Sequence, residues 1–69
     1  MKARLDVKTI RSRSGLSQSQ FAERYGFNLR TLQDWESNRV QPPSAIRAYL
    51  AVIERFPQEV ARALSETRG

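Results

Sequence analysis

Four polar residues stand at the spacing that places them together on one side of a helix: Arg30, Gln33, Asp34 and Ser37. Residues three, four and seven positions apart share a helix face, because each residue turns the helix by about 100°. A guanidinium, an amide, a carboxylate and a hydroxyl on one face supply hydrogen-bond donors and acceptors of several kinds. The pattern predicts that this face meets a partner outside the chain through polar contacts.

The side chains that most often carry out catalysis or bind metals are missing from the sequence. The 69 residues include no histidine, no cysteine and no glycine-rich loop of the kind that cradles phosphates. The carboxylates are scattered, without a pattern that predicts their burial. We therefore expect a protein that is not an enzyme, with no catalytic residue, cofactor, metal site or disulfide bond.

Positive charge is concentrated in the first part of the chain. Twelve Lys and Arg residues against seven Asp and Glu residues give a net charge of +5. Residues 1–39 hold eight basic and four acidic residues, whereas residues 40–69 hold four and three. An excess of basic residues favours a polyanionic partner such as nucleic acid, although basic proteins without such a partner are also common.

The composition is that of one small folded domain. Hydrophobic residues make up 39% of the chain and charged residues 28%, which is ordinary for a globular protein. We expect a single domain over residues 1–69, with its core in about residues 6–65. No apolar run approaches the roughly 18 to 20 residues that span a bilayer, and the basic start is followed by polar sequence. The expected location is the cytoplasm, with no membrane contact.

Start and stop signals predict two short helices near the beginning of the chain. Asp6 suits the N-cap of the first helix and Gly15 its end. Ser17 and Gln20 form the S-x-x-Q pattern of a capping box, which starts the second helix at Gln18. The residues expected to face the core from these helices are Val7, Ile10, Phe21, Ala22 and Tyr25.

Only three residues separate the second helix from a third. Gly26 can adopt the positive φ that ends a helix, Phe27 fills the corner, and Asn28 is a good N-cap. Leu32 and Trp35 then fall together on the inward side of the third helix, opposite the polar face. We therefore expect the Trp35 ring in the core rather than as a platform for stacking.

Two further helices complete the prediction. Pro42 and Pro43 cannot continue a helix, and Ser44 is expected to cap the fourth helix. Pro57 suits the first position of a fifth helix, which should fray after Ser65. The core-facing stripe of the fourth helix, at i, i+3, i+4 and i+7, consists of Ile46, Tyr49, Leu50 and Ile53. These elements predict an all-α fold, a compact bundle of four to five helices.

Two helices joined by a three-residue turn with glycine can place one helix against a DNA backbone and the next in the major groove. The sequence resembles the phage-repressor and Cro type (XRE-like) helix-turn-helix domain, through L-S-Q-x-x-F-A at Leu16 to Ala22, Gly26 in the turn, and L-x-x-W-E at Leu32 to Glu36. The likeness covers roughly residues 6 to 56. It implies a lambda-repressor-like fold that binds double-stranded DNA in a sequence-specific way.

Within that superfamily the chain is most similar to HigA-type antitoxins, through D-V-K-x-I-R at Asp6 to Arg11 and R-T-L-Q-x-W-E at Arg30 to Glu36. This resemblance implies a homodimeric transcriptional repressor that binds a palindromic operator, autoregulates a toxin–antitoxin operon and has a cognate toxin as a further partner. Such antitoxins commonly carry an extra segment ahead of this domain, whereas five residues precede Asp6 here. A truncated DNA-binding part and a stand-alone phage-type repressor therefore both stay open.

The resemblance assigns the outward face of the third helix to base readout. Arg30 can pair through two hydrogen bonds with guanine O6 and N7, and Gln33 with adenine N6 and N7. Asp34 either accepts from cytosine N4 or orients Arg30, and we favour the orienting role. Leu29 either contacts a thymine methyl group or completes the core, and we favour the core.

The residues expected to contact the DNA backbone lie at helix starts and in the loop after the third helix: Ser17, Gln18, Asn28, Thr31, Ser37, Asn38 and Arg39. Ser17 and Asn28 can also serve as helix caps alone, and Gln18 can be a solvated residue. Arg11 and Glu36 match positions that form a partly buried ion pair between the first and third helices in some phage repressors. A loose surface pair is the alternative.

A symmetric operator requires two copies of the chain. The apolar residues expected at a dimer interface are Val52, Phe56, Val60 and Leu64, with the alternative that some of them only close the monomer core. A protein-interaction module that neutralises a toxin is the competing interpretation, against which the polar character of Arg30 and Gln33 counts. RNA binding is disfavoured because the exposed faces lack aromatic platforms for stacked bases.

Overall fold

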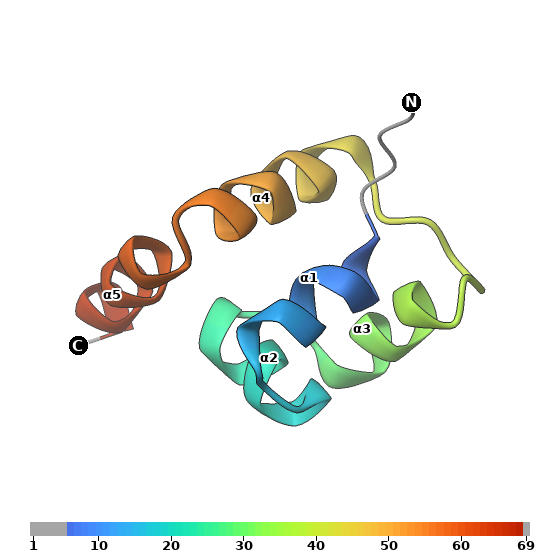
Figure 1. Ribbon diagram of the computed structural model, residues 1–69, viewed down its shortest axis with the longest axis horizontal. Helices are drawn as coiled ribbons and strands as arrows, with labels where there is room; N and C mark the ends of the chain where they lie inside the picture. Colours follow the sequence, from blue (N-terminus) through green and yellow to red (C-terminus); the bar gives the residue numbers. More distant parts are fainter. Residues whose placement is uncertain (1–5, 69) are drawn as a thin grey trace.

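The computed structural model describes residues 6–68, so residues 1–5 and Gly69 of the predicted domain lie outside the described part. The described residues form five α-helices and contain no β-strand (Figure 1). The helices are α1 (Val7–Ser14), α2 (Gln18–Tyr25), α3 (Leu29–Glu36), α4 (Ser44–Arg55) and α5 (Pro57–Arg68). The predicted all-α bundle is therefore confirmed.

The three short helices form one group, and the two longer helices pack against it (Figure 1). Helix α1 packs against α3 and α4, while α5 packs against α2 and α4. Helix α2 packs against α3, its neighbour in sequence. None of the helices in residues 6–68 has the length and apolar character needed to cross a membrane.

The first two helices begin and end where their capping signals predict. The Asp6 side chain accepts a hydrogen bond from the Lys8 amide at 3.2 Å, and Gly15 ends α1 with φ of 76°. The Ser17 hydroxyl accepts from the Gln20 amide at 3.1 Å, and the Gln20 side chain accepts from the Ser17 amide at 2.9 Å. This reciprocal capping box starts α2 at the predicted residue.

Two predicted helix ends are wrong. Ser44 is the first residue of α4 and not its cap; Pro43 occupies the cap position without a side-chain hydrogen bond. The extended backbone of Pro43 already leads into the helix, and its carbonyl accepts from the Arg47 amide at 2.9 Å. Helix α5 continues past Ser65 to Arg68, and the Thr67 hydroxyl in its last turn donates to the Ala63 carbonyl at 2.9 Å.

The core lies between α2, α3 and α4. Phe21, Leu32 and Leu50 are its fully buried large side chains, and Trp35 is buried beside them. Helix α5 closes one side of this core through partly buried apolar residues: Val60, Ala61 and Leu64. Since every helix contributes to one cluster, the orientation of α3 depends on the packing of the whole bundle.

Candidate nucleic-acid interface

The turn between α2 and α3 is held by one main-chain oxygen. The Ala22 carbonyl accepts from the Gly26 amide and from the Phe27 amide, the latter at 2.8 Å. Gly26 has φ of 82°, a left-handed conformation that a residue with a Cβ rarely adopts. Asn28 then caps α3 by accepting from the Thr31 amide at 3.2 Å. The chain therefore changes direction within three residues.

An aromatic cluster sets the angle between α2 and α3. The Phe27 ring lies between three others, with centroid distances of 5.9 Å to Phe21, 5.4 Å to Trp35 and 5.6 Å to Tyr49. The contact with Trp35 is edge to face, a favourable arrangement for two rings. Phe27 therefore acts as the wedge predicted for this corner and joins α2, α3 and α4.

Two tyrosines connect the end of α2 with the longer helices. The Tyr49 hydroxyl of α4 donates to the Tyr25 carbonyl at 2.8 Å. The Tyr25 hydroxyl in turn donates to the Pro57 carbonyl at the start of α5, at 3.2 Å. Because both acceptors are main-chain oxygens, the end of α2 is fixed relative to α4 and α5.

The outward face of α3 is polar and exposed. The Arg30 side chain is 80% exposed, and Gln33 and Ser37 are also exposed, while Leu32 and Trp35 fill the opposite face. The prediction that Trp35 belongs to the core is therefore confirmed.

Leu29 differs from its predicted core role. It is exposed, and it does not belong to the hydrophobic core cluster or to the partly buried residues around it. Leu29 lies one helical turn before Gln33 and so shares the outward side of α3. The interpretation of Leu29 as a core residue is wrong, and its methyl groups stand among the polar side chains of this face.

A bidentate ion pair between Arg11 and Glu36 connects α1 with the end of α3. Arg11 donates from Nε and Nη2 to the two carboxylate oxygens of Glu36, at 2.7 and 2.9 Å, and from Nη1 to the Leu16 carbonyl at 3.1 Å. The side chains of Arg11 and Glu36 are only 17% and 5% exposed. The partly buried pair expected from the resemblance is thus confirmed, and the alternative of a loose surface pair is wrong.

The pair shifts the ionisation of both groups. Burial disfavours the charged form of Glu36, but the hydrogen bonds from Arg11 and Gln18 and the charge of Arg11 outweigh it and lower the pKa of Glu36. The hydrogen bond with Glu36 raises the pKa of Arg11. Both residues are therefore charged throughout the physiological range.

Gln18 connects the start of α2 with α3. Its Nε2 donates to Glu36 Oε1 at 3.0 Å, and its Oε1 accepts from Gln33 Nε2 at 3.4 Å. Gln18 is partly buried, so the alternative of a freely solvated side chain is wrong. We did not predict these contacts, because they depend on how two helices cross and no spacing within either helix signals them.

Asp34 lies beside two arginines at the end of the polar face. Its Oδ1 is 3.7 Å from Arg30 Nε, one helical turn earlier, and 4.0 Å from Arg39 Nε. The first contact is the one required by the predicted orienting role. The second was missed by the sequence interpretation, because Arg39 reaches Asp34 only through the reversal of the chain after α3.

The residues predicted to contact the DNA backbone occupy three short stretches of the chain: residues 17–18, 28–31 and 37–39. Ser17 and Asn28 act as caps at the starts of α2 and α3, and Thr31 is partly buried in the first turn of α3. Ser37 ends α3, and its hydroxyl donates to the Asp34 carbonyl at 3.1 Å. The loop that follows contains Asn38, with φ of 65°, and the exposed Arg39.

The predicted dimer interface divides into two pairs. Val52 on α4 and Phe56, the C-cap that follows it, are 47% and 52% exposed, with the Arg55 guanidinium 5.9 Å from the Phe56 ring centroid. Val60 and Leu64 on α5 are partly buried against the core, so a large part of their apolar surface closes the monomer. Of the four residues predicted for the interface, Val52 and Phe56 therefore have the most accessible apolar surface.

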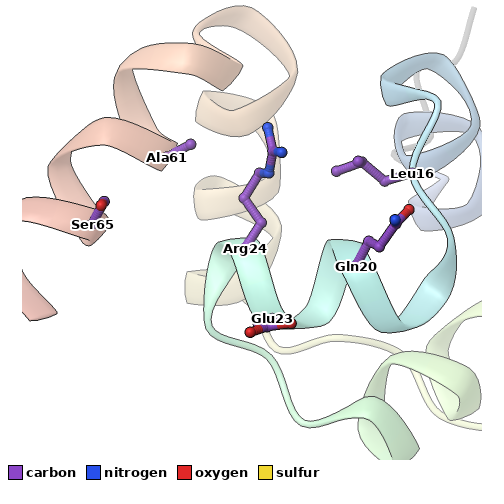
Figure 2. A pocket seen from close by; sticks show the side chains of 6 residues that line it. All are labelled: Leu16, Gln20, Glu23, Arg24, Ala61 and Ser65. Carbon is purple, nitrogen blue, oxygen red and sulfur yellow. The ribbon is translucent and has the colours of Figure 1, made fainter.

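An open hollow of about 420 Å³ lies between α2 and α5. Figure 2 shows Gln20, Glu23 and Arg24 on α2, with Ala61 and Ser65 on the neighbouring α5. The Arg24 guanidinium extends into the space between the helices. None of the lining residues belongs to the set predicted to contact DNA. In residues 6–68, no group of three or more acidic side chains is arranged to hold a metal ion.

Comparisons with known proteins agree with this geometry. A helix-turn-helix family model matches residues 7–54 of the chain. The crystal structure of an XRE-family-like helix-turn-helix protein from Agrobacterium tumefaciens is 43% identical to it, with a TM-score of 0.83. The match covers 84% of this chain and 94% of that chain. No curated protein sequence matches.

Proposed function

The chain belongs to the helix-turn-helix family of DNA-binding transcription regulators, and from this premise we propose that it is a homodimeric repressor of a palindromic operator. In this proposal α3 lies in the major groove and α2 braces against the DNA backbone. The function requires binding and no catalysis. A regulator of this kind acts where the chromosome is, so we place it in the cytoplasm, as a single domain over residues 1–69.

The exposed polar face of α3 is the observation that carries this proposal. It stands on a helix whose position is fixed by the Arg11–Glu36 pair and by the Phe27 wedge. A face held in place in this way can meet base edges without paying to order itself first. We assign base contacts to Leu29, Arg30 and Gln33, and to Asp34 the role of orienting Arg30. We assign backbone contacts to Ser17, Gln18, Asn28, Thr31, Ser37, Asn38 and Arg39.

The dimer follows from the symmetry of a palindrome. Two recognition helices must lie about 34 Å apart, one turn of DNA, to enter successive major grooves on one side of the duplex. The exposed end of α4, with Val52 and Phe56, supports a contact between copies, because exposed apolar side chains are stabilised by burial. Val60 and Leu64 extend this contact with the parts of their surface that the core leaves accessible.

The antitoxin role is the finer proposal, and the resemblance to HigA-type antitoxins supports it. In that role the protein represses its own operon and neutralises a toxin encoded beside it. The hollow between α2 and α5 offers a toxin a surface apart from α3, so both partners can bind together. A neighbouring gene for a small toxin, and co-purification of its product with this chain, would support the role. A neighbour unrelated to toxins would favour a stand-alone phage-type repressor.

A titration of duplex DNA tests the main proposal. We would first select preferred duplexes from a randomised pool, and then measure their dissociation constants at several salt concentrations. We expect a palindromic consensus and an affinity that falls steeply with salt, because binding releases counterions from the phosphates. Failure to enrich any duplex, with no salt-dependent binding, would favour the protein-interaction alternative.

A further inference from the structure

Asp34 is the one carboxylate on the outward face of α3. Its Oδ1 stands between two exposed arginines, 3.7 Å from Arg30 Nε and 4.0 Å from Arg39 Nε. We propose that Asp34 is a specificity-determining residue that holds both arginines when α3 meets non-cognate DNA. On the cognate site, a contact between Arg30 and a base replaces the contact between Arg30 and Asp34. The proposal rests on the DNA-binding function proposed above.

The contact with Arg39 is built into the fold. Asn38 adopts a left-handed conformation, with φ of 65°, which reverses the chain directly after α3. The Arg39 and Val40 amides then donate to the Asp34 carbonyl at 3.0 and 3.4 Å. The main-chain carbonyl of Asp34 thus binds the loop that follows α3, and its carboxylate lies beside the Arg39 side chain.

The charges of residues 29–40 indicate that Asp34 weakens electrostatic binding to DNA of any sequence. Residues 29–40 hold two arginines, Arg30 and Arg39, and two carboxylates, Asp34 and Glu36, so their formal charges cancel although the whole chain carries +5. Glu36 is already taken by Arg11 and Gln18. Sequence-independent binding depends on cations that neutralise phosphates, and Asp34 reduces that capacity at the proposed contact surface.

The relative strengths of the contacts explain why a base, but not a phosphate, would displace Asp34 from Arg30. An exposed ion pair changes an equilibrium constant by up to roughly fivefold. A bidentate contact between arginine and guanine discriminates between bases by roughly five- to 150-fold. Arg30 therefore binds a phosphate with little more free energy than it binds the Asp34 carboxylate. A correctly placed guanine binds Arg30 more strongly than the carboxylate does.

The test compares Asp34→Asn with Glu59→Gln, a matched loss of one negative charge at an exposed site on α5. Each variant is titrated with a random duplex and with the selected operator at several salt concentrations. Asp34→Asn should bind the random duplex about two- to tenfold more tightly than Glu59→Gln does, with a salt slope steeper by up to about two. Its operator affinity should stay equal or fall, so the ratio of operator to random binding decreases.

A third variant tests whether the tighter binding of Asp34→Asn to the random duplex depends on Arg39. In the Asp34→Asn, Arg39→Gln double variant, the extra affinity for the random duplex should fall, and the salt slope should return by about one unit. Equal behaviour of Asp34→Asn and Glu59→Gln would overturn the proposal. So would a change of preferred base at one operator position without tighter random binding, because Asp34 would then contact a base directly. If the parent binds neither duplex, the proposed function itself fails.

Discussion

Arg11 in α1 and Glu36 at the end of α3 are joined by two hydrogen bonds, although 25 residues separate them in sequence. The pair is almost closed to solvent, and Gln18 of α2 donates a third hydrogen bond to the same carboxylate. One acidic side chain thus connects the three helices that carry the proposed DNA-binding surface. The stability of this connection is open to direct measurement.

The stability of the protein should depend on pH through Glu36. Its pKa is lowered on folding, so the pair stabilises the fold fully above the unfolded carboxyl pKa, about 4.3, and loses this effect as the pH falls through the folded value. We expect Glu36→Gln to cost about 2 kcal/mol at pH 7. The difference from the parent in urea unfolding should shrink toward pH 3. A difference that stays constant over this range would contradict the assignment.

Removal of the Trp35 ring should destabilise the domain severely. Trp35 is buried and meets the Phe27 ring edge to face, so Trp35→Ala leaves a cavity where α3 joins the core. We expect a loss of roughly 3 to 5 kcal/mol in the free energy of unfolding, measured by thermal or urea denaturation. Val40→Ala, at an exposed residue, is the control and should stay close to the parent. A Trp35→Ala variant that melts like the parent would show that α3 does not depend on this contact.

Removal of each arginine beside Asp34 should change DNA affinity in a different way. Arg30→Ala should cost roughly 1 to 3 kcal/mol per half-site on the selected operator and little on random duplex, because a base contact discriminates. Arg39→Ala should weaken binding to the operator and flatten its salt slope by about one unit, with a smaller loss on random duplex, where Asp34 competes for Arg39. Titrations at several salt concentrations distinguish these patterns. Equal losses on both duplexes for Arg30→Ala would make it a phosphate contact.

Polar residues at the exposed end of α4 should prevent dimerisation without unfolding the monomer. Val52 and Phe56 are about half exposed, so the Val52→Ser, Phe56→Ser variant changes accessible surface more than core. We expect a monomer in sedimentation, and binding to the palindrome reduced to the level of a single half-site. Ala63→Ser, on the exposed side of α5, is the control. A variant that forms dimers as readily as the parent would place the interface elsewhere.

Much of the fold could be predicted because its helix boundaries are signalled locally. Asp6, Ser17 and Asn28 cap the helices that they were predicted to cap, and Gly26 has the predicted positive φ. Ser44 shows the limit of such signals, because a proline with extended backbone had already taken the cap position. A good capping residue next to such a proline therefore does not by itself locate the helix start.

The candidate site was less predictable, since its contacts join separate elements. Helical spacing was enough to place Arg30 near Asp34. It could not show that Arg39 also reaches Asp34, because that contact requires the left-handed conformation of Asn38. Leu29 was misplaced for a related reason: a residue at the edge of an apolar stripe is buried only if another element covers it.

The two tyrosine hydrogen bonds have a consequence for how the sequence can change over evolution. Tyr49 reaches the carbonyl of Tyr25, and Tyr25 reaches the carbonyl of Pro57, so each acceptor is present whatever side chain that position carries. Substitutions at Pro57 that keep the backbone path retain the acceptor. The side chain at the start of α5 can therefore change while the end of α2 keeps its hydrogen bond to α5.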